Sequence, residues 1–170
     1  MSLPEVWLRG ERVDGISTAL QPVAHALLQA MEEVERAVAP LSDTELWVTP
    51  GGAASVGFHL RHIAGSTDRL LAYARGEQLS DAQMRALRAE KEFATELDAA
   101  ALVAQVRAAV EQALDQLRAT PDASLDDPRE VGRGRLPSSV RGLLYHVGEH
   151  TARHSGQVVT TAKVVRGLAG

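Results

Sequence analysis

Apolar residues recur at steps of three and four along four long stretches of this chain, and this spacing constrains its fold more than any other feature. It places apolar side chains on one face of an α-helix, which completes a turn about every 3.6 residues. No long run alternates apolar and polar residues as a strand would, and aromatic residues make up only 4% of the chain. We therefore expect an all-α fold, and 170 residues suffice for one domain with a buried core.

Proline residues set the limits of the first expected helix. Residues 1–15 are expected to form an N-terminal extension, and residues 16–170 the single domain. The first helix then takes up most of residues 16–40. Pro22 is tolerable only near its first turn, and Pro40 ends it.

Polar capping residues indicate where the next two helices begin. Ser55 is an expected N-cap of a second helix, which Gly76 ends as the residue after the C-cap. Ser80 and Gln83 have the spacing of a capping box, which predicts a short third helix running through about residue 92.

The second half of the chain predicts two more long helices. Asp98 is expected to cap one that stops at Pro121, and the other runs from near Ser138 to about Arg166. Residues 121–137 between them are rich in proline, glycine and aspartate, which predicts a long connection. Two connections are too long for simple hairpins, so we expect a four-helix bundle with crossover connections and a short extra helix.

Composition excludes several classes of protein. The net charge of −4 is spread along the chain without a basic stripe, so we expect no nucleic-acid partner. The chain has no cysteine, which excludes disulfides, thiolate–metal sites and a cysteine nucleophile. No apolar stretch is long enough to span a membrane, and the N-terminus lacks the pattern of a signal peptide. We therefore expect a cytoplasmic protein without a membrane partner.

Three of the six histidines lie in the last expected helix, at a spacing of four. They are His146, His150 and His154, and on a helix they form a ridge. The outer two are separated by about 12 Å at about 1.5 Å of rise per residue. A zinc–nitrogen bond is only about 2.0–2.1 Å long, so at most one adjacent pair can share an ion.

The apolar stripe of this helix selects the second pair. The stripe continues through His150 and His154, whereas His146 lies on its flank. Two imidazoles in a buried stripe need partners, because burying polar groups unpaired is costly. A metal ion would satisfy both at once, and hydrogen-bonded packing histidines are the structural alternative.

A third ligand could come from the second helix, which contains His59 and His62. Periodicity favours His59, at the edge of the main apolar stripe, while His62 lies on a second, semi-polar face. His25 in the first helix is a weaker candidate. The segment also matches the H-x-x-E-H protease pattern, but that pattern would require the pair His146 and His150, against the stripe.

The chain resembles the DinB/YfiT-like family of bacterial metalloenzymes in two motifs. The first is "SVGFHLRHIAGSTDRLLAYARGE", and the second, near the C-terminus, is "LLYHVGEHTARHSGQV". The resemblance covers roughly residues 16–166. It implies a four-helix bundle with a three-histidine metal site, and by motif position it implies His62, His150 and His154 as the ligands, in place of His59.

The resemblance also implies a function. Family members include metal-dependent transferases that use low-molecular-weight thiols such as bacillithiol or mycothiol, and others are described as hydrolases. Zinc or nickel is the implied metal, with a small-molecule substrate and a homodimer as the implied assembly. This chain departs from many members at Arg153 and Ser155, where a histidine and an arginine are common, so substrate contacts there are expected to differ.

We therefore expect a metal-dependent low-molecular-weight-thiol S-transferase. The alternatives are a metal-dependent hydrolase and a non-enzymatic metal- or ligand-binding stress-response bundle. No general base is evident, because Glu149 points away from the apolar stripe. Gln157, one turn beyond His154, is a candidate partner for a metal-bound imidazole, and Arg69 is a candidate contact for an anionic substrate.

Overall fold

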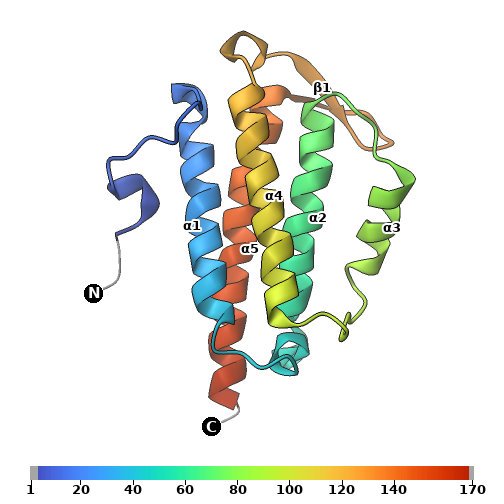
Figure 1. The fold of residues 1–170 in the computed structure, drawn as a ribbon. Coiled ribbons are helices and arrows are strands. Elements are labelled where there is room, and N and C mark those ends of the chain that lie inside the picture. The colour runs from blue at the N-terminus through green and yellow to red at the C-terminus, as the bar shows by residue number, and fades with distance from the viewer. Residues whose placement is uncertain (1–3, 169–170) are drawn as a thin grey trace.

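The computed structural model describes residues 4–168, which form a four-helix bundle with a short outer helix (Figure 1). The helices are α1 (Gln21–Val38), α2 (Val56–Ala74), α3 (Asp81–Ala89), α4 (Ala99–Ala119) and α5 (Val140–Leu168). Around the bundle, α1 packs on α5, α5 on α2, α2 on α4, and α4 on α1. The predicted all-α bundle with long crossover connections and one extra helix is confirmed.

The direction of the helices places α2 and α5 antiparallel. In Figure 1, α1 and α5 run downward whereas α2 and α4 run upward. The segment that joins α2 to α4 must therefore return the chain to the lower end of the bundle. Helix α3 lies on this return path, outside the bundle, where it contacts α2.

The predicted helix caps are present. Ser55 Oγ accepts a hydrogen bond from the Phe58 backbone N–H, and Ser80 forms a full capping box with Gln83. Asp98 accepts from the Ala101 backbone N–H. Gly76 follows α2 with φ of 82°, the left-handed conformation predicted for it. These short-range polar bonds satisfy helix ends without any tertiary contact.

A small hairpin replaces the predicted irregular connection before α5. Its strands are β1 (Pro128–Val131) and β2 (Leu136–Ser139), which pair antiparallel. Ser138 lies opposite Arg129 in this ladder, so α5 begins at Val140, two residues later than predicted. Helix α3 also ends earlier than predicted, because the chain leaves it after Ala89.

The N-terminal segment folds back onto α1. Val6 is buried, its backbone N–H donates to Gln29 Oε1, and Arg9 forms a two-pronged ion pair with Glu32. Single 3-10 turns occur at Val6–Leu8, Thr18–Leu20, Glu45–Trp47, Pro50–Gly52 and Asp122–Ser124.

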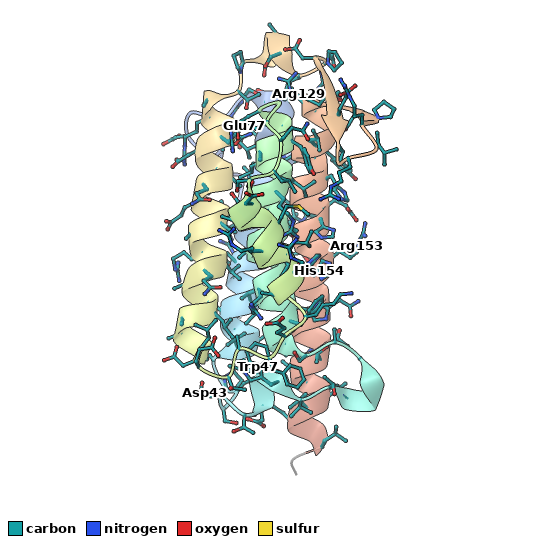
Figure 2. The ribbon with its side chains drawn as sticks, turned by 90° about the vertical axis from the view of Figure 1, so that its right-hand side faces the viewer. Asp43, Trp47, Glu77, Arg129, Arg153 and His154 are labelled. Atoms are coloured by element: carbon teal, nitrogen blue, oxygen red, sulfur yellow. The ribbon has the colours of Figure 1, made fainter. Side chains whose placement is uncertain are left out.

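The connection between α1 and α2 packs tightly against the start of α2. A Cβ atom at Gly57 would lie 2.6 Å from the Trp47 ring, so only glycine admits the indole there. Trp47 lies near the end of the bundle where α2 begins (Figure 2). The contact holds the first turn of α2 in place just before its two histidines. Among residues 4–168, no helix combines the length and apolar character needed to cross a membrane.

Candidate metal centre

The antiparallel packing of α2 on α5 brings polar side chains of the two helices together along one seam. Thr67 lies opposite Thr151, with their hydroxyl oxygens 3.4 Å apart. Further along the same seam, His62 meets His150 and His59 meets His154. Helix periodicity and antiparallel packing thus bring histidines from two distant sequence motifs into one cluster.

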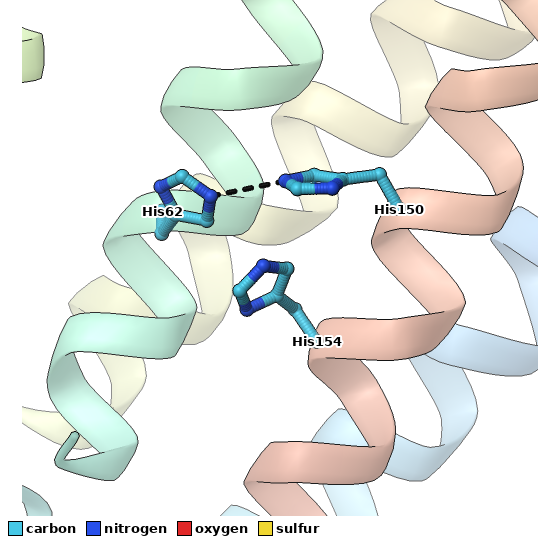
Figure 3. A group of neighbouring side chains, drawn as sticks. All are labelled: His62, His150 and His154. Atoms are coloured by element: carbon cyan, nitrogen blue, oxygen red, sulfur yellow. Dashed lines mark hydrogen bonds between the residues drawn. The ribbon is translucent and has the colours of Figure 1, made fainter. Parts of the chain in front are cut away.

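Three of these imidazoles form the cluster that the motifs predict. One nitrogen from each of His62, His150 and His154 lies within 4.8 Å of the others, and the group could hold a metal ion. The rings point toward one another across the seam, one from α2 and two from α5 (Figure 3).

Hydrogen bonds determine which nitrogen His62 offers. Its Nδ1 lies 2.8 Å from Glu90 Oε2. A carboxylate can only accept, so Nδ1 carries a proton and donates it to Glu90, and the nitrogen that His62 can offer to a metal is the other one. That atom, Nε2, lies 3.0 Å from Nε2 of His150.

Glu90 is a site residue that the sequence does not predict. It follows α3 directly and is only 5% exposed. Its second oxygen, Oε1, accepts from Arg69 Nη1 at 2.5 Å. Burial raises the pKa of Glu90, but the hydrogen bonds from His62 and Arg69 outweigh burial, so the pKa lies below its ordinary value. Glu90 is therefore an ionised acceptor.

His59 lies behind His154, outside the three-histidine cluster. It is 6% exposed, and its Nδ1 lies 3.0 Å from Nδ1 of His154. That contact occupies the outer nitrogen of His154 and leaves Nε2 to face the other two rings. Both histidines of α2 thus belong to the site, with His62 in the cluster and His59 supporting it.

Two rings of the cluster, those of His150 and His154, are held in the neutral state that metals bind. Burial, followed by the proximity of His62, lowers the pKa of His150 and of His154 to about 4. Burial also lowers the pKa of His59. At neutral pH these imidazoles have lone pairs available, as metal coordination requires.

The donor set and its spacing suit a divalent ion. Two nitrogens bound to one tetrahedral zinc lie about 3.3 Å apart when each bond is about 2.0–2.1 Å. The His62 and His150 Nε2 atoms already lie 3.0 Å apart. Within residues 4–168, the buried Nδ1 of His150 has no hydrogen-bond partner, so the polar contact of this ring is the one through Nε2. An ion bound to the Nε2 atoms of His62 and His150 would take the place of the proton in the hydrogen bond between them.

The neighbouring residues of α5 lie outside the cluster. His146 Nδ1 is 3.2 Å from Glu149 Oε2, and Glu149 also pairs with Arg153 on the surface. The glutamate of the H-x-x-E-H pattern is thus held away from the three rings. Ser155 is buried and its Oγ donates to Glu33 Oε2 at 2.8 Å, on the α1 side of α5.

Two candidate supporting residues, Gln157 and Arg69, do not contact the three rings in the candidate roles. Gln157 is exposed, and the outer nitrogens of His62 and His154 are bonded instead by Glu90 and His59. Arg69 is buried in its ion pair with Glu90, so it is not available to an anionic substrate. His25 contacts the Glu11 carbonyl and takes no part in the cluster.

Cavity size alone would have pointed elsewhere. Cavities of about 690 and 750 Å³ border α1, and none of the three histidines lines either of them. The cluster instead lies in the α2–α5 seam, where Phe58 stacks on His62 with ring centroids 5.5 Å apart. We identify the site by its donor chemistry, because open surface grooves between helices form for packing reasons alone.

Comparison with known proteins identifies a family. The family model described as DinB superfamily matches residues 26–158, which extend from α1 into α5 and include all three histidines of the cluster. A comparison with curated proteins finds no match.

Proposed function

The chain belongs to the DinB superfamily, and we propose that it is a metal-dependent enzyme whose ion is held by His62, His150 and His154. The observation that carries the proposal is the meeting of three imidazole nitrogens within 4.8 Å, on two antiparallel helices. Two of the rings have a pKa of about 4 and are neutral at physiological pH.

Zinc or nickel is the ion we propose, since neutral imidazoles suit both metals. Three protein ligands leave a coordination position for a substrate, as in catalytic zinc sites generally. When bound, such an ion would lower the pKa of a coordinated thiol or water, and so supply a nucleophile at neutral pH.

The protein's own residues orient the ligands and shield them. Glu90 fixes the protonated nitrogen of His62, and His59 occupies the outer nitrogen of His154. Phe58 covers one face of the His62 ring. These contacts orient the inner nitrogens of His62 and His154 toward His150.

The reaction we propose is transfer of a low-molecular-weight thiol, such as bacillithiol, to a small electrophile. The chain has no cysteine, so the reacting sulfur would come from a cosubstrate. The thiolate would attack the electrophilic carbon, a carbon–sulfur bond would form, and the leaving group would depart with its electron pair.

Metal content tests the first part of the proposal. The purified protein, reloaded with zinc or nickel and desalted, should retain about one ion per chain, as a single three-histidine site requires. His150→Ala should retain almost none. A wild-type protein that keeps no metal after reloading would overturn the proposal.

Thiol consumption tests the second part. The zinc-loaded protein, given bacillithiol and a model alkyl halide, should consume the thiol faster than the His150→Ala variant. Hydrolysis of model esters or amides without thiol consumption would instead identify a hydrolase. Metal uptake with neither activity would contradict the proposed reaction with these substrates and leave a metal-binding bundle.

A further inference from the structure

Glu90 is the buried anchor of an otherwise exposed element. No side chain of α3, Asp81–Ala89, is buried, yet Glu90, the residue that follows it, is 5% exposed. The chain thus carries a carboxylate from the outer helix into the wall of the α2–α5 seam. Burying a carboxylate is costly unless it is paired, so its partners must hold it.

Each oxygen of Glu90 has a different partner on α2. Oε1 accepts from Arg69 at 2.5 Å, and Oε2 accepts from His62 Nδ1 at 2.8 Å. His62 and Arg69 are seven residues apart on the helix, so they lie on the same face about two turns apart. The bond to Arg69 fixes the rotation of the carboxylate, and the carboxylate in turn fixes the rotation of the imidazole.

The sequence of α2 leaves room for this carboxylate. Gly65 lies between its two partners, and a Cβ atom there would overlap Glu90 Oε1 and lie 2.8 Å from Arg69 Nη1. Glycine in the interior of a helix costs about 1 kcal/mol relative to alanine. A glycine at this position is therefore accounted for by the close approach of Glu90.

We propose that Glu90 is a positioning residue of the metal centre, admitted by the gap at Gly65, so that the α3 segment forms part of the site. This inference rests on the proposed function, because it assigns Glu90 a role toward the ion held by His62. The contact holds Nδ1 of His62 against the carboxylate and aims Nε2 at His150. Losing such an outer partner typically weakens metal affinity about 10–100-fold.

Zinc affinity, measured by competition with a chromophoric chelator, tests the role. Glu90→Ala and Gly65→Ala should each bind zinc about 10–100-fold more weakly than wild type. Gly65→Ala keeps every charged group, so it separates displacement of Glu90 from loss of its charge. The matched control is Asp68→Ala, which removes another carboxylate that joins α2 to α3, through Gln83, and should leave zinc affinity unchanged.

The double variant that combines Gly65→Ala with Glu90→Ala tests whether position 65 acts through Glu90. Once Glu90 is alanine, there is no carboxylate for a Cβ atom at position 65 to displace. Gly65→Ala should therefore lower zinc affinity in the wild-type background and have little effect in the Glu90→Ala background. Equal effects in the two backgrounds would overturn the proposal, since they would show that position 65 acts independently of Glu90.

The metal-free protein provides a readout that does not depend on zinc. Long-range nitrogen–proton NMR spectra should show His62 protonated on Nδ1 in wild type and in Asp68→Ala. In Glu90→Ala that preference should be lost. A wild-type His62 protonated on Nε2 would overturn the proposal, even if a variant failed to fold.

The two proposals fail in distinguishable ways. A wild-type protein that binds no zinc overturns the proposed function and this inference with it. If wild type and Glu90→Ala bind zinc equally tightly, only the proposed role of Glu90 is overturned.

Discussion

Helix α5 presents two different faces to its two neighbours in the bundle. Toward α1 it presents small side chains: a Cβ atom at Gly148 would lie 3.1 Å from Val23, and Ser155 lies against the Ala30 carbonyl. Toward α2 it presents the rings of His150 and His154. One face packs by close approach, and the other leaves polar groups that need partners.

The two faces of α5 therefore have different roles: one contributes folding stability, and the other carries the candidate metal site. The α1–α5 face is held by packing and by one buried hydroxyl hydrogen bond, and both partners of that bond belong to these two helices. The α2–α5 seam contains imidazoles whose partners include Glu90, which comes from outside the bundle. Substitutions in the apolar core should therefore change folding stability, and substitutions in the seam should change metal binding.

The largest effect is expected in the apolar core. Leu27 of α1 is fully buried, and Leu27→Ala should lower the free energy of unfolding by about 2–5 kcal/mol. Denaturant titration of the metal-free protein measures this loss. The folded fraction should still bind zinc with nearly wild-type affinity, and a large loss of affinity in folded Leu27→Ala would break the separation between the two faces.

In the seam, His150→Ala should remove stabilisation by metal while leaving the metal-free bundle folded. Zinc present at about 100 times its Kd stabilises a binding protein by about 2.7 kcal/mol. Wild type should show this gain in thermal melts and His150→Ala should not. His146→Ala is the matched control, because His146 lies one turn away and outside the cluster; an equal loss there would contradict the ligand assignment.

Acid should destabilise the metal-free protein between pH 6.5 and 4. The pKa of His150 and of His154 is about 4 in the folded state and 6.5 ordinarily, so the unfolded chain binds more protons in this window. Their contribution is fully present above pH 6.5 and is lost as the pH falls toward 4. The loss should be moderate, because both rings are partly exposed. Melting temperatures across this range should fall less steeply in a His150→Gln, His154→Gln double variant; a parallel fall would contradict the prediction.

The smallest effect is expected at His59, which supports the cluster without joining it. His59→Phe keeps an aromatic ring and removes the partner of His154 Nδ1, so zinc affinity should fall roughly tenfold, or about 1.4 kcal/mol. His25→Phe, which changes a histidine far from the seam, should have no effect on zinc affinity. Complete loss of zinc binding in His59→Phe would instead mark His59 as a ligand.

Local signals predicted most of the bundle. Ser55, Ser80 and Asp98 cap helices through bonds to residues three positions away, which a sequence pattern contains directly. The hairpin before α5 escaped prediction because each strand is only four residues long and its turn uses a left-handed Arg135, with φ of 48°. Short strands lack the repeated alternation that distinguishes them from a loop.

The site was predictable only in part. The stripe position of His150 and His154 follows from periodicity within one helix, but His59 and His62 both lie at the edge of a wide buried arc. Periodicity favoured His59, and the family motif was needed to identify His62. Glu90 gave no signal, because its bond to His62 joins residues 28 positions apart and depends on how α3 docks.

A crystal structure of the zinc-loaded protein, with anomalous scattering recorded at the zinc edge, tests the central claim most directly. We expect a single strong peak bonded to the Nε2 atoms of His62, His150 and His154, with Glu90 still bonded to His62. A peak bonded to His146 and His150, or no peak within reach of the three rings, would contradict it.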